Sequence, residues 1–169
     1  MFLELILIFC FPAAMCLAAS MDFFTMTIPN RISLFLLGLF LLLAPFLGLS
    51  FPEVGMHLLA GFSMLLVSIV FFYFGWIGGG DAKIFAVASL WFGFEHLLEY
   101  VVFASLLGGL LTLGLLSVRK IPLPAFLARQ EWALRLHDAN GGIPYGIALG
   151  AAALIVYPET SWMKMALIN

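Results

Sequence analysis

Charged residues are scarce in this sequence: only 9% of its 169 residues are Asp, Glu, Lys or Arg, while 64% are hydrophobic. A soluble domain of this size carries roughly 25% charged residues. So few polar side chains cannot cover a water-soluble surface, and lipid must therefore form part of the surroundings. The net charge of −2 gives no basis for binding nucleic acid. The length favours one domain, and we expect residues 1–169 to form a single membrane-embedded unit without a large soluble part.

Several chemical signatures are also missing. The only two cysteines, Cys10 and Cys16, lie in one apolar run, so the chain has neither a CxxC pair nor a Cys/His cluster with zinc spacing. We expect both cysteines to be small buried apolar residues. Neither HExxH nor GxSxG occurs, so metalloprotease and serine-hydrolase chemistry lack their residues. We expect no metal site and no cofactor.

What the sequence has in abundance is apolar runs. Six of them fall at about Phe2–Ser20, Ile32–Ser50, Val54–Ile77, Ala82–Gly93, Leu97–Val118 and Ile143–Tyr157. A helix that crosses a bilayer needs about 20 apolar residues, so the fourth and sixth runs are short and imply tilt mismatch, a thinned bilayer or a cavity that water enters. No run alternates in the manner of barrel strands. The sequence therefore predicts an all-α polytopic membrane protein with about six transmembrane helices.

Basic residues are distributed unevenly between these runs. If the chain crosses at each run, six Lys and Arg residues fall on one side and only Lys164 falls on the other. Because Lys and Arg favour the cytoplasm, both termini should face outward. The longest connection, Arg119–Gly142, should then be cytoplasmic. Within it, Ala125–His137 is expected to form a short helix on the membrane surface, with Trp132 at headgroup depth.

Two aspartates occupy equivalent places in this scheme. Asp22 ends the first run and Asp81 opens the fourth, so alternation puts both at the cytoplasmic ends of their helices. Two carboxyl groups that lie close together cannot both ionise cheaply, and such a pair can perform general acid–base catalysis on a peptide bond. Helix capping alone also explains Asp81, since this residue begins a helix after three glycines.

Three glycines, Gly78–Gly80, precede Asp81. They permit backbone conformations that other residues avoid, and they form either a flexible turn or a segment that presents backbone groups to an extended substrate. Lys83 follows Asp81 by two residues, and it either contacts lipid headgroups, which we favour, or interacts with a nearby aspartate. Asp138 and Asn140 are interpreted as turn formers.

Taken together, these residues resemble the prepilin peptidases. Gly78–Asp81 matches the GxGD motif of polytopic aspartyl proteases, and a lysine two residues later is similar to that family. The IPN sequence after Asp22 and the IPYG sequence before the last run are similar to two further motifs, and the short length resembles the Cpa/Tad branch, which serves Flp-type pili. Besides the aspartates, the resemblance marks Gly78, Gly80, Lys83, Pro29, Asn30, Pro144, Tyr145 and Gly146.

The resemblance implies an aspartyl endopeptidase of the bacterial inner membrane whose active site lies near the cytoplasmic face. Asp22 and Asp81 would be catalytic, and they would remove the short basic leader of a prepilin or pseudopilin without a metal. The partners would be this substrate, membrane lipid and the pilus assembly machinery. We expect no N-methyltransferase activity, because the chain has one compact set of spans and no added soluble domain. One departure concerns leader recognition: uncharged residues fill Phe23–Thr27, where the family often has basic ones.

Non-enzymatic alternatives stay open on the residues alone. One is a small transporter or channel subunit that relays protons through Asp22 and Asp81, since ionisable groups inside membrane bundles often do so. Another is an assembly protein in which the glycines serve packing. A relay is expected to place its carboxylates near the bilayer midplane, whereas these two fall at one face.

Overall fold

The protein is a bundle of helices, and the computed structural model describes residues 2–168. No strand occurs in this range, which confirms the all-α prediction. The elements are α1 (Phe2–Thr25), α2 (Asn30–Leu43), α3 (Phe51–Tyr73), α4 (Gly79–Val118), α5 (Glu131–His137), α6 (Tyr145–Val156), the 3-10 turn η1 (Tyr157–Glu159) and α7 (Ser161–Ile168).

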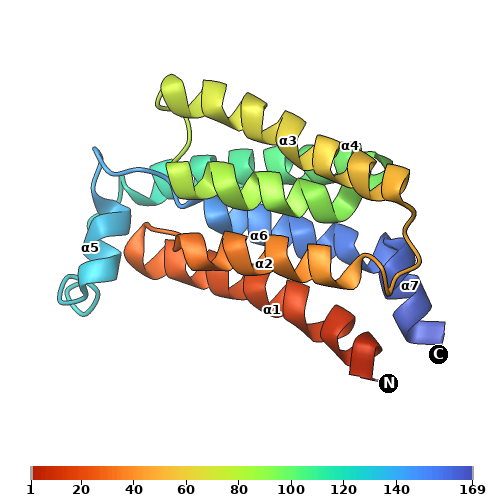
Figure 1. Ribbon diagram of the computed structural model, residues 1–169. Helices are drawn as coiled ribbons and strands as arrows, with labels where there is room; N and C mark the ends of the chain where they lie inside the picture. Colours follow the sequence, from red (N-terminus) through yellow and green to blue (C-terminus); the bar gives the residue numbers. More distant parts are fainter. Residues whose placement is uncertain (1, 169) are drawn as a thin grey trace.

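The long helix α4 is two antiparallel segments. Gly93 interrupts it with φ 59° and ψ −173°, and Figure 1 shows the chain reversing so that the two halves run side by side. Ring contacts across the reversal agree: the Tyr100 ring lies 4.8 Å from the Phe92 ring and 5.3 Å from the Phe85 ring. The sequence predicted the connection between the fourth and fifth apolar runs at Phe94–His96. It falls on Gly93 because a positive φ suits glycine.

Three of the described helices, α1, α3 and α4, are long and apolar enough to cross a membrane by length and composition. Two apolar helices, α2 and α6, are shorter. With α4 counted as two segments, the six apolar runs do become six helical segments. How many of them cross the bilayer stays a prediction.

The helix α6 packs against both α1 and α4, while α3 covers α4 and α7 packs against α1. At the core, the Phe11 ring stacks on Tyr157 at 4.4 Å and lies 5.0 Å from Trp91. The Trp91 indole N–H donates to the Leu36 carbonyl at 3.0 Å, so this buried polar group is satisfied. The prediction that both cysteines are buried was wrong, because Cys16 is exposed and Cys10 is only partly buried.

One end of the bundle carries α5 and the long connection, and the opposite end carries both termini and α7 (Figure 1). The Arg119 guanidinium folds this connection by donating to the carbonyl groups of Leu136, Gly141 and Gly142 at 2.8, 3.1 and 2.7 Å. The short helix predicted for Ala125–His137 is present only from Glu131.

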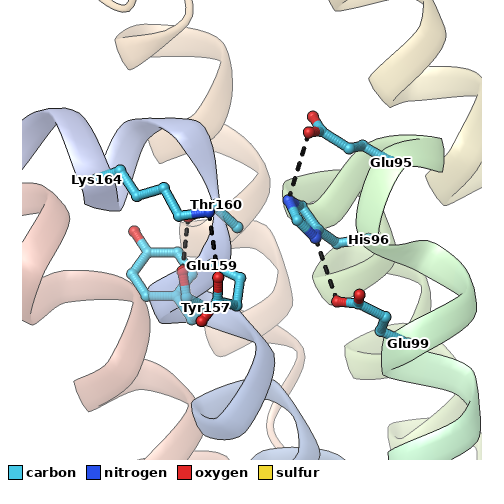
Figure 2. A network of polar contacts seen from close by, with 7 residues as sticks. All are labelled: Glu95, His96, Glu99, Tyr157, Glu159, Thr160 and Lys164. Carbon is cyan, nitrogen blue, oxygen red and sulfur yellow. Dashed lines mark hydrogen bonds and ion pairs between the residues drawn. The ribbon is translucent and has the colours of Figure 1, made fainter.

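The opposite end is acidic, and its charges pair locally (Figure 2). The His96 imidazole lies between two carboxylates, 3.8 Å from Glu95 and 3.3 Å from Glu99. Lys164 Nζ lies 3.1 Å from the Glu159 carboxylate. Exposed pairs of this kind contribute roughly 0–1 kcal/mol each, so they contribute little to holding this end together.

Candidate active site

Asp22 lies in the last turn of α1, which ends for a backbone reason. Met26 has φ 54°, and its N–H donates to the Asp22 carbonyl oxygen at 2.8 Å. A left-handed residue just beyond the last turn is a common way for a helix to end. The chain leaves toward α2 from there, and the Asp22 side chain is only 4% exposed.

The Asp22 carboxyl is held by the start of α6. Its Oδ2 accepts a hydrogen bond from the Gly146 N–H at 2.7 Å. A Cβ on Gly146 would lie 2.8 Å from Ile28 Cδ1 and 2.9 Å from both Cβ and Oδ2 of Asp22. The missing side chain therefore lets the first turn of α6 reach the carboxyl, and the amides at a helix start favour a negative group.

Asp81 is the third residue of α4 and is 7% exposed. Its Oδ2 accepts a hydrogen bond from the Gly78 N–H at 3.1 Å, which is the capping contact expected at this helix position. Its Oδ1 is buried and has no hydrogen-bond partner in the described part of the chain. An unpaired buried acceptor costs about 1–3 kcal/mol. Capping accounts for one oxygen of Asp81, and the other is available to a ligand.

Both carboxyl groups line one pocket of about 410 Å³. The two carboxyl groups interact electrostatically. The other residues that line this carboxyl pocket are Met26, Thr27, Ile28, Asn30, Phe72, Gly78, Gly79, Gly80 and Lys83. The predicted pair from α1 and α4 is therefore brought together at one end of the bundle.

The three glycines before Asp81 are not equivalent. A Cβ on Gly80 would lie 3.1 Å from Ile28 Cβ and 3.2 Å from its backbone nitrogen, and a Cβ on Gly78 would lie 2.9 Å from Asp81 Oδ2. At Gly79 a Cβ would meet only the Phe72 ring, at an ordinary 3.5 Å. The first and third glycines thus lie in close approach to neighbouring atoms, and the second does not.

A model of the type IV leader peptidase family matches residues 9–113, a range that contains both aspartates and the glycine motif. The chain belongs to the type IV leader peptidase family. It is therefore related to proteases, which confirms the resemblance to prepilin peptidases and agrees with its long apolar helices. No curated protein and no solved structure matches the chain.

In this member of the leader peptidase family, two further residues that the resemblance marked contact each other directly. Lys83 Nζ donates to Asn30 Oδ1 at 2.8 Å, which joins the first residue of α2 to the start of α4. Pro29 precedes α2 with an extended backbone, φ −63° and ψ 136°. The sequence favoured a headgroup role for Lys83, and it did not predict this contact.

Pro144 and Tyr145 do not line the carboxyl pocket. Pro144 is buried just before α6, and the Tyr145 hydroxyl lies 3.3 Å from Thr112 Oγ1 on the second half of α4. The Tyr145 ring would lie 3.5 Å from a Cβ on Gly108. Tyr145 therefore holds the start of α6 against α4, and with it the Gly146 amide that binds Asp22.

The sequence analysis missed three residues that line the carboxyl pocket: Met26, Thr27 and Phe72. The first two offer one signal, their place between Asp22 and the IPN motif, whereas Phe72 looks like any aromatic in an apolar run.

The turn interpretation of Asp138 is confirmed, because its Oδ1 accepts a hydrogen bond from the Asn140 N–H at 3.0 Å.

Proposed function

We propose that this protein is a membrane aspartyl endopeptidase that removes the short basic leader of a prepilin or pseudopilin at the cytoplasmic face. Asp22 and Asp81 are the catalytic pair in this proposal. The observation that supports it most is that two buried carboxyl groups from different helices line one pocket, where Asp81 Oδ1 has no hydrogen-bond partner among residues 2–168.

The proposed reaction needs only a peptide bond and water. The pair holds one proton in common, which belongs to the pair rather than to either residue. The ionised carboxyl takes a proton from water as the water oxygen attacks the carbonyl carbon, and the other carboxyl gives its proton to the carbonyl oxygen. When the C–N bond breaks, the first carboxyl passes its proton to the leaving amine, and the second recovers a proton from the new carboxyl group. The pair then again holds one proton.

The long basic connection supports the cytoplasmic side. It lies at the same end as the aspartates, since the Trp132 ring on α5 is 5.3 Å from the Phe23 ring next to Asp22. Basic residues favour the cytoplasm. We further propose that the protein lies in the inner membrane, that its substrate is an Flp-type pilin, and that it cleaves without methylating the product. Mass spectrometry of the mature pilin N-terminus tests the last point.

The test is co-expression with a candidate prepilin, scored by the size shift of the pilin. Asp22→Asn and Asp81→Asn keep shape and volume and should each abolish cleavage while the protein stays in the membrane at its normal level. The double variant should be little worse than either, because groups that act as a unit are non-additive. Asp138→Asn is the control, and it should cleave normally.

A well-inserted single Asn variant that still processes prepilin at near wild-type rate would contradict the proposal. If the same variant had lost a proton flux across the membrane, the relay interpretation would take its place.

A further inference from the structure

A second groove meets the carboxyl pocket at Asp81. It has a volume of about 490 Å³ and runs over both halves of α4, the end of α3 and the start of α6. Its walls are mostly apolar, and its polar groups are those of Ser105, Thr112, Tyr145 and Asp81. Among the described residues, Asp81 is the one that lines both this groove and the carboxyl pocket.

The second half of α4 gives this groove a floor of small side chains. They are Ala104, Ser105, Gly108, Gly109 and Thr112. Residues four apart share one face of a helix, and small residues on such a face let another helix approach closely in a membrane. A Cβ on Gly109 would meet nothing within 4 Å, so no neighbouring side chain of the protein covers this part of the floor.

A buried carboxyl oxygen lies at one end of the groove. Asp81 is 7% exposed, and its Oδ1 has no hydrogen-bond partner in the described part of the chain. The groove therefore combines an open, small-residue floor with an unpaired polar group at its end. That combination suits a ligand with a long apolar part that begins beside a polar, reactive bond.

We infer that this groove seats the apolar helix of the substrate immediately after the scissile bond, while the leader lies in the carboxyl pocket. The inference rests on the proposed function. A substrate that is polar before the cut and apolar after it places its junction where the more polar carboxyl pocket meets the mostly apolar groove, and here that point is Asp81.

Another groove of the same volume lies between α2, α3 and the first half of α4. It shares Asn30 and Lys83 with the carboxyl pocket, but neither Asp22 nor Asp81 lines it. A substrate helix seated there would begin beside Asn30 and Lys83 rather than beside one of the two carboxyl groups. The groove over the second half of α4 is therefore the one that fits the chemistry.

Gly109→Leu tests the assignment, with Gly114→Leu as the matched control. A Cβ would meet nothing within 4 Å at either position, so both substitutions suit the fold, yet only Gly109 lines the groove. Each enzyme is given full-length prepilin in vesicles and a soluble peptide that ends a few residues after the junction. We compare kcat/KM for full-length prepilin with kcat/KM for the peptide. This ratio, prepilin over peptide, should fall roughly a hundredfold for Gly109→Leu, since misplacing the scissile bond by about 1 Å costs a factor of that order. Gly114→Leu should keep the wild-type ratio.

If this ratio were equal in the two leucine variants, the assignment of the substrate helix to this groove would be wrong, while the peptidase proposal would stay intact. A wild-type enzyme that cleaves neither substrate would overturn the proposed function and the groove with it. A second measurement does not depend on turnover: in Asp81→Asn, a photo-crosslinker at position 109 should capture the apolar helix of prepilin. Capture only from position 58, which lines the other groove, would place the helix there and overturn the inference.

Discussion

Gly79 and Gly80 are neighbours at the start of α4, yet a methyl group on each would meet different surroundings. At position 80 it would press on the backbone of Ile28 at 3.2 Å, whereas at position 79 it would touch only the Phe72 ring. Gly80→Ala should therefore cost about 1–3 kcal/mol of stability by overpacking and should slow prepilin cleavage. Gly79→Ala should change stability by less than about 1 kcal/mol and cleave normally.

Thermal unfolding in detergent, with cleavage measured on the same samples, checks this pair. The two alanine variants have the same composition and change adjacent residues in the first turn of α4, so helix propensity nearly cancels between them. Equal losses in both would show that the close approach to Ile28 has no consequence.

The pH dependence of cleavage also belongs to single residues. Lowering the pH adds a second proton to the Asp22–Asp81 pair and removes its base, and raising the pH takes the last proton and removes its acid. The rate should therefore fall on both sides of an optimum, and the two limbs describe the pair. A kcat/KM profile with prepilin checks this, and a rate that only rises with pH would contradict the shared proton.

The two aspartates were predictable because helix alternation places charged residues at a defined end. The role of Gly146 was not derivable from spacing, since it depends on how closely α6 approaches Asp22. Lys83 illustrates the same limit: sequence identifies the cation, but only the packing of α2 on α4 brings it to Asn30. Contacts between segments far apart in the chain need the fold.

Among the elements, the reversal inside α4 depends on Gly93. Its φ of 59° excludes most side chains, and a Cβ there would lie 2.5 Å from His57 Cε1. Gly93→Ala should lower stability by about 1–3 kcal/mol from backbone strain alone, and further through the clash with the imidazole. Gly114→Ala on the same helix should be neutral or slightly stabilising, because its site is open.

Thermal unfolding of the two variants, monitored by circular dichroism, checks these expectations. Similar unfolding midpoints would mean that the reversal at Gly93 tolerates a side chain. Hydropathy separated the two halves of α4 correctly, but it could not assign the turn to Gly93 rather than to the next residues. The helix predicted around α5 was too long, because 125–130 contains turns held by hydrogen bonds such as that from the Leu127 N–H to the Pro124 carbonyl.

At the scale of the whole molecule, the bundle has a basic end with the aspartates and an acidic end with both termini. If the basic end is cytoplasmic, Ala128→Cys should be shielded from an impermeant thiol reagent in intact cells, and Glu159→Cys should be labelled. Cys10 and Cys16 are first replaced by alanine, because Cys16 is exposed. Labelling at 128 alone would reverse the orientation and place the proposed catalytic pair on the other side of the membrane.

The hydrogen bond between Asp22 and Gly146 joins positions 124 residues apart in the chain. During synthesis the ribosome releases the first helix long before it releases the start of α6. A growing chain therefore contains both aspartates while the amide that holds one of them is still unmade. In the proposed mechanism, the nascent protein therefore cannot complete its active site before the ribosome has released the start of α6.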